Sequence, residues 1–161
     1  MSPKSNLLRD EIEETVKMLG IDRARFSEYS KQRYEDILKK FYQTFFDLPR
    51  RQLAYSFYPW TNIRKQWVRT DCAGYLQHDG DWLSYLEKVR RLVPAADDRK
   101  LLLITSDDFV YEGFPQEIFA VLGEVTTGLL RDFYLVSPKF DWLIVYSDDA
   151  DCASLHERKQ T

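Results

Sequence analysis

The two cysteines and two histidines of the chain fall into two pairs, Cys72 with His78 and Cys152 with His156. Two thiolates and two imidazoles are sufficient ligands for a tetrahedral zinc site, and the second pair would share one face of a helical turn. The spacing between Cys72 and His78 is not a standard ligand spacing, and a cysteine in a core behaves as a small apolar side chain. We therefore keep the four residues as a metal candidate only, and expect neither a bound metal nor a cofactor.

Carboxylates gather at two places in the last third of the chain. Paired carboxylates bind magnesium or act as acid and base, but they also form local hydrogen bonds in turns. No partner base or nucleophile can be named beside them. We expect them to bind a basic partner by charge complementarity, with two tyrosines as aromatic anchors. The expected partner-binding residues are Asp107, Asp108, Tyr111, Tyr146, Asp148, Asp149 and Asp151.

A basic, aromatic segment lies between Asp47 and Asp71 and contains no acidic residue. Cations interleaved with rings are typical of surfaces that stack on single-stranded nucleic acid and neutralise its phosphates. The same rings are equally compatible with a core whose neighbouring cations are solvated, and the whole chain is not basic. The alternative function is therefore a nucleic-acid-binding or regulatory module that uses Arg50, Arg51, Arg64, Lys65 and Arg69.

Catalytic motifs are missing around these clusters. The sequence contains no phosphate-binding glycine loop, no dinucleotide fingerprint, no nucleophile elbow and no zinc-protease helix. Six glycines in 161 residues leave little material for turns that approach a phosphate. We therefore expect a protein that is not an enzyme.

Composition indicates one globular domain, with 44% hydrophobic and 30% charged residues over 161 positions. We expect residues 1–161 to form a single domain. The apolar runs are far shorter than the ~20 residues of a membrane span, and the start of the chain does not resemble a signal peptide. Two cysteines do not make a disulfide framework, so we expect a cytoplasmic protein. The net charge of −3 is unevenly distributed, with +4 over residues 1–100 and −7 over residues 101–161.

Hydrophobic periodicity predicts helices over residues 5–19 and 27–48. Asp81 is a plausible cap for a third helix that Pro94 ends, and Pro115 marks the first turn of a short fourth helix. Residues 100–105 and 109–112 are typical of strands. A hairpin follows, with strands over 132–136 and 140–146 joined by a proline turn. The stretch 50–78 has no clear periodicity. The expected fold is α+β, with N-terminal helices packed on a mainly antiparallel sheet of four to five strands around a central 133–146 hairpin.

The hairpin region is similar to that of small bacterial proteins from uncharacterised families, which carry a Tyr-Ile-Val-Ser-x-Lys-Phe-x-Trp-Leu hairpin. The residues that carry the resemblance are Val110-Tyr111-Glu112-Gly113 and Asp132-Phe133-Tyr134-Leu135-Val136-Ser137-Pro138-Lys139-Phe140-Asp141-Trp142-Leu143-Ile144. Several such small domains resemble immunity proteins encoded beside toxins. Their hairpin is often followed by paired histidines, and Ser147-Asp148-Asp149 stands in that place here.

The resemblance and the missing motifs together favour a non-enzymatic inhibitor. We expect an immunity protein, or antitoxin, that neutralises a basic toxin or effector by covering it with an acidic surface. An inhibitor of this kind needs complementary shape and charge and no reacting group.

Overall fold

The computed structural model describes residues 7–45, 70–94, 99–105, 109–125, 130, 132–147 and 152–158. Four helices and seven strands lie within these residues. In chain order they are α1 (Leu7–Leu19), β1 (Phe26–Glu28), α2 (Lys31–Phe45), β2 (Thr70–Gln77), α4 (Trp82–Arg90), β3 (Leu101–Thr105), β4 (Val110–Gly113), α5 (Pro115–Glu124), β5 (Phe133–Val136), β6 (Trp142–Ser147) and β7 (Cys152–Arg158).

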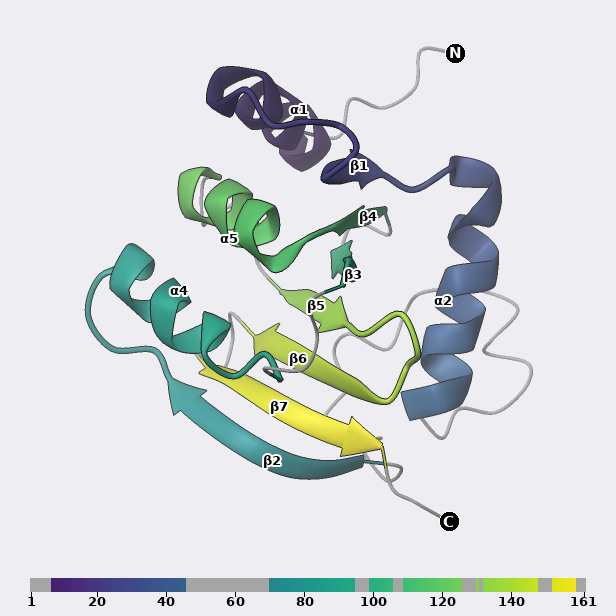
Figure 1. Ribbon diagram of the computed structural model, residues 1–161. Coiled ribbons are helices and arrows are strands. Elements are labelled where there is room, and N and C mark those ends of the chain that lie inside the picture. The colour runs from purple at the N-terminus through teal and green to yellow at the C-terminus, as the bar shows by residue number, and fades with distance from the viewer. Residues whose placement is uncertain are drawn as a thin grey trace.

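All seven strands form one antiparallel sheet with the order β1-β4-β3-β5-β6-β7-β2. Helices α1, α4 and α5 cover one face, and α2 covers the other (Figure 1). The α+β class, the antiparallel pairing and the central β5–β6 hairpin confirm the prediction. The expected number of strands was too low.

Three strands account for the difference. The short strand β1 lies where the second helix was expected to begin, and that helix begins at Lys31 instead. Strand β2 lies entirely within the stretch 50–78, which has no clear periodicity. Strand β7 replaces the expected helical turn, and its alternation of buried Ala153 and Leu155 with half-exposed neighbours is the two-residue period of a strand.

The central strands are buried on both faces, and successive residues enter different cores. Leu101 and Leu103 of β3 pack under α1, α4 and α5, whereas Leu102 and Ile104 pack under α2. Strands β5 and β6 alternate in the same way. Their continuous apolar sequence is therefore explained by cover on two sides.

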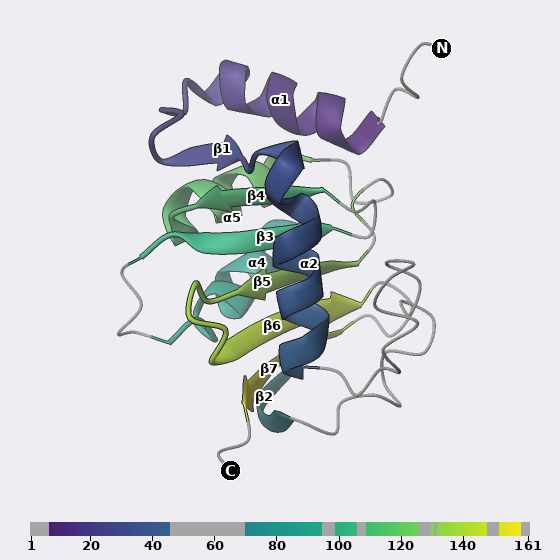
Figure 2. The ribbon, with the colours of Figure 1, turned by 90° about the vertical axis from the view of Figure 1, so that its right-hand side faces the viewer.

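Helix α2 crosses the strands of its face (Figure 2). Leu38, Phe41 and Phe45 recur at helical spacing and are buried. The Phe41 ring lies 4.8 Å from that of Tyr134 and 5.7 Å from that of Phe45. One aromatic stripe thus covers the α2 face of the central strands.

Local signals define the ends of the other helices. Gly20, at φ 65°, follows α1 and completes a Schellman motif in which Ile21 N donates to Val16 O at 3.0 Å. The Asp81 side chain accepts from Ser84 N at 2.8 Å and caps α4, while Pro115 occupies the first turn of α5. No helix among the described residues is long and apolar enough to cross a membrane.

Two glycines give opposite expectations on replacement by alanine. A Cβ on Gly113 would lie 2.6 Å from Phe26 Cδ2 and 3.0 Å from the backbone Arg25 O, so β1 must move. We expect Gly113→Ala to lower the free energy of unfolding by about 1–3 kcal/mol in chemical denaturation.

Gly123→Ala is the matched control. Its Cβ would meet Leu83 Cδ2 at 3.0 Å, and Leu83 is an exposed side chain that can rotate away. Alanine also raises helix propensity in α5, so we expect a gain of roughly 0–1 kcal/mol. Equal losses in both variants would contradict the close β1–β4 approach.

Candidate functional site

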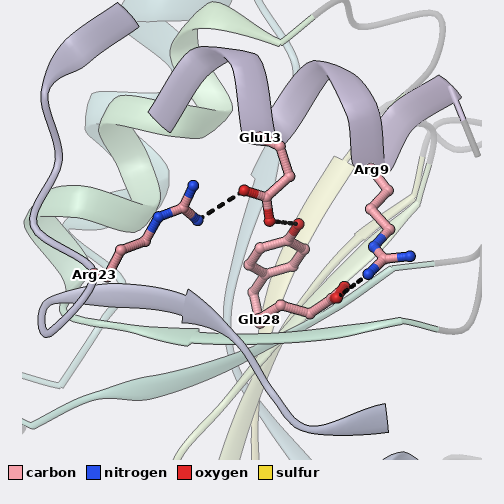
Figure 3. Close-up of polar contacts among 5 residues, drawn as sticks. Arg9, Glu13, Arg23 and Glu28 are labelled. Atoms are coloured by element: carbon pink, nitrogen blue, oxygen red, sulfur yellow. Dashed lines mark hydrogen bonds and ion pairs between the residues drawn. The ribbon is translucent and has the colours of Figure 1, made fainter. Parts of the chain in front are cut away.

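A cluster of charged and phenolic side chains ties α1 to the β1 edge of the sheet (Figure 3). The Tyr111 hydroxyl of β4 donates to Glu13 Oε1 at 2.9 Å, and Glu13 Oε2 pairs with Arg23 at 2.7 Å. Arg9 of α1 forms an ion pair with Glu28 of β1. Side chains of α1 therefore link this helix to β4, to the segment that carries Arg23 and to β1.

The tyrosines of this cluster are strongly biased toward the neutral form. Burial raises the pKa of Tyr111, and its hydrogen bond to Glu13 raises it further. Burial also raises the pKa of Tyr34, a residue of α2 next to this cluster, and the Glu28 carboxylate adds to that effect. The neutral Tyr111 hydroxyl donates to the Glu13 carboxylate, and this contact helps to position α1 on the sheet.

Tyr111 and Tyr146, the two expected anchors, both lie in the core. Tyr111 is fully buried, and Tyr146 is 5% exposed, with ring centroids 5.2 Å from Trp82 and 5.3 Å from Phe133. Neither ring belongs to the surface, so neither is available as an anchor for a partner.

The register brings several strand ends together at one end of the sheet. A single row crosses five strands through Thr105, Phe133, Tyr146, Ala153 and Leu76. At or just beyond this row, β3, β6 and β2 end while β5 and β7 begin. The chain between these ends carries the expected residues Asp107, Asp108, Asp148, Asp149 and Asp151, which lie outside the described residues.

Described residues at the same end are also acidic. Asp79 and Asp81 follow β2, Asp132 precedes β5, and Glu124 ends α5. The α4 and α5 ends meet here, because Trp82 Nε1 donates to Leu122 O at 2.9 Å. We call the surface of Asp79, Asp81, Glu124 and Asp132 the acidic end.

The four metal candidates are separated along the β2–β7 ladder. Cys72 is opposite His156, whereas Cys152 is opposite Gln77, the residue before His78. His156 follows Cys152 by four residue steps along an extended strand, a distance of roughly 13 Å. Cys72 and His156 therefore lie toward one end of the ladder, and Cys152 and His78 toward the other. No group of three or more His, Cys, Asp or Glu among the described residues is placed to hold a metal.

His156 has a different local role. Its Nε2 lies 2.8 Å from Ser154 Oγ on the same face of β7, and burial lowers its pKa. The imidazole is therefore biased toward its neutral form. The alternative nucleic-acid residues Arg50, Arg51, Arg64, Lys65 and Arg69 lie outside the described residues.

A groove at the opposite end of the sheet has no counterpart in the sequence predictions. It has a volume of about 250 Å³ and is lined by Pro94, Arg99, Ser137, Pro138, Lys139, Asp141 and Trp142. The lining comes from segments that are distant in sequence, and the hairpin part was interpreted only as a turn. No local pattern marks such a groove.

Comparison with known families places the whole described sheet within one family. Residues 4–161 match a family described as Family of unknown function (DUF6756). The chain belongs to this family. No curated protein and no solved structure matches it. The family description assigns no activity, so function is argued from the geometry of this chain.

Alkaline pH tests the polar cluster. Tyr111 stays protonated in the folded state above its ordinary pKa of 10, whereas it ionises in the unfolded chain. The free energy of unfolding should therefore fall above about pH 10, by about 1.4 kcal/mol per pH unit for this residue. We expect Tyr111→Phe to be less stable at pH 7 and to lose less stability between about pH 10 and 11.5. Denaturant titrations at each pH measure both effects.

Tyr75→Phe is the matched control, because the Tyr75 ring is 58% exposed. It should retain the alkaline dependence of the unmodified chain. A Tyr111→Phe variant with an unchanged alkaline dependence would show that the buried hydroxyl does not contribute to it.

Proposed function

We propose that the protein is a non-enzymatic inhibitor that binds a basic partner protein through its acidic end. The most specific form of this proposal is an immunity protein, or antitoxin, that neutralises a toxin by occlusion. The observation that carries it is the meeting of strand ends and helix ends that bear Asp79, Asp81, Glu124 and Asp132. In the sequence, the five expected aspartates fall between β3 and β4 and between β6 and β7.

Charge favours this partner class. Residues 101–161 carry a balance of −7, and their strand ends contribute to the acidic end. Clustered carboxylates attract a basic surface over several ångströms and raise the rate of association. They also disfavour acidic partners, which gives specificity without a catalytic group.

Aromatic packing and a hydrogen bond hold the start of α4 against the sheet at the acidic end. Trp82 follows the Asp81 cap, is half-buried and packs its ring 5.2 Å from that of Tyr146. The Tyr85 hydroxyl, one turn later in α4, donates to Leu76 O at 2.7 Å and ties the helix to the edge strand β2. A surface held in place before binding loses less conformational entropy when the complex forms.

Neutralising carboxylates of the acidic end, and of the connection between β6 and β7, tests the proposal. With the purified partner, we expect the double variant Asp148→Asn, Asp149→Asn to weaken binding roughly tenfold in calorimetry at low salt. The double variant Asp79→Asn, Glu124→Gln should also weaken binding of the partner. Binding by the unmodified chain should fall as salt rises, because exposed charge pairs are screened.

The matched control removes two charges elsewhere. Asp10→Asn, Glu14→Gln changes exposed positions on α1 and causes the same change in net charge. It should bind the partner as the unmodified chain does. The partner is sought first as the product of the neighbouring reading frame, co-expressed to score rescue of growth. Equal binding by all three double variants would contradict docking through the acidic end.

A further inference from the structure

The groove at the end of the sheet opposite the acidic end is built by two segments. Pro94 and Arg99 come from the stretch between α4 and β3, and the β5–β6 hairpin contributes the rest of the lining. Residues 95–98 lie outside the described residues, so the lining is that of the described part. Ser137 and Trp142 are nearly fully buried and form the floor, while Arg99, Lys139 and Asp141 are exposed at the rim.

The backbone of the β5–β6 hairpin is restrained where it forms the rim of the groove. Phe140 N donates to Ser137 O at 2.9 Å and closes a turn, and Phe140 itself has a φ of 57°. The left-handed region costs a non-glycine residue roughly 1–2 kcal/mol. The Phe140 ring is 2% exposed and lies 6.4 Å from that of Phe45, so core packing offsets this strain. Lys139 is thereby attached to a restrained backbone.

Side-chain contacts orient the carboxylate of the groove. The Ser137 hydroxyl donates to Asp141 Oδ1, and the Asp141 carbonyl accepts from Arg158 N at 2.9 Å. One carboxylate oxygen of Asp141 is thus held toward Ser137. The other has no protein donor among the described residues and is available to a donor on a ligand.

The two cations of the groove form no ion pair within the described part of the chain. Lys100, the neighbour of Arg99, lies 4.0 Å from Glu112, whereas Arg99 and Lys139 have no such partner there. With Asp141 ionised, the three charged rim residues carry a formal sum of +1. That balance suits one carboxylate better than a phosphate dianion, which the Asp141 carboxylate would also repel.

We infer that this groove binds a small organic carboxylate, with its carboxylate between Arg99 and Lys139 and a neighbouring hydroxyl or ammonium group at Asp141. The guanidinium of Arg99 donates two parallel hydrogen bonds to a carboxylate, and Lys139 adds a second charge. Pro94 and Pro138 supply an apolar wall above the floor of Ser137 and Trp142. The volume of about 250 Å³ is below that of most drug-sized pockets and selects ligands of a few heavy atoms.

This site lies away from the acidic end and does not depend on the proposed inhibitor role. The experiment is a titration of the ¹⁵N-labelled full chain with lactate, acetate and inorganic phosphate at constant ionic strength. We expect saturable shifts at Ser137, Lys139 and the Trp142 indole, with lactate binding more tightly than acetate because its hydroxyl reaches Asp141. Phosphate should bind more weakly than either carboxylate.

Single substitutions test whether Arg99 and Lys139 bind the carboxylate of the ligand. Arg99→Gln and Lys139→Gln should each raise the lactate Kd about tenfold or more, as expected for the loss of a charge-assisted contact. Lys17→Gln, at an exposed position of α1, is the matched control and should leave the Kd unchanged. Both rim variants should unfold at the same denaturant concentration as the unmodified chain, because their side chains are exposed.

Three outcomes would overturn the inference. The first is no saturable shift at the groove with either carboxylate, and the second is tighter binding of phosphate than of lactate. The third is an equal loss of affinity in Lys17→Gln and the rim variants, which would indicate a general charge effect. Partner binding by Arg99→Gln that equals that of the unmodified chain would separate this site from the acidic end.

Discussion

Burial of the central strands on both faces is the constraint on which the rest of the structure depends. Strands β3, β5 and β6 present apolar side chains to both sides, so each side must be covered. Helices α1, α4 and α5 cover one face, and α2 covers the other with its stripe of Leu38, Phe41 and Phe45. Strands β3, β5 and β6 carry no charged residue, so the charged side chains of the described chain lie on the outer strands, the connections and the helices.

The separation of charge along the strands follows from this arrangement. The end with Asp79, Asp81, Glu124 and Asp132 differs in sign from the end with Arg99 and Lys139, and apolar strands lie between them. Exposed charges this far apart interact weakly at physiological salt. Each end therefore presents its own electrostatic field to the solvent.

Sequence reasoning succeeded where the signal was local. The proline turn at 137–139, the Asp81 cap and Pro115 each act through neighbouring backbone groups, and each lies where it was expected.

Prediction from the sequence failed where a strand is defined by its pairing with a segment that is distant in sequence. The strands β1 and β7 are short or weakly patterned and are stabilised by partners far away in sequence. Tyr111 and Tyr146 were placed on the surface for the same reason, since burial in a doubly covered sheet depends on helices that the strand pattern does not reveal. The groove at Arg99 and Lys139 requires two distant segments to meet, which no local pattern encodes.

The position of the last strand governs how the sheet is completed. Strand β7 lies between β6 and β2, so β2 obtains its only described strand partner from residues 152–158, some eighty positions later in the chain. During synthesis, β2 emerges long before β7 and has no ladder to join. Pairing over such a distance carries a large loop-closure cost and is typical of late folding steps. The carboxyl-terminal strand therefore acts as the closing element of the sheet, and its removal would strip two strands from the structure rather than one.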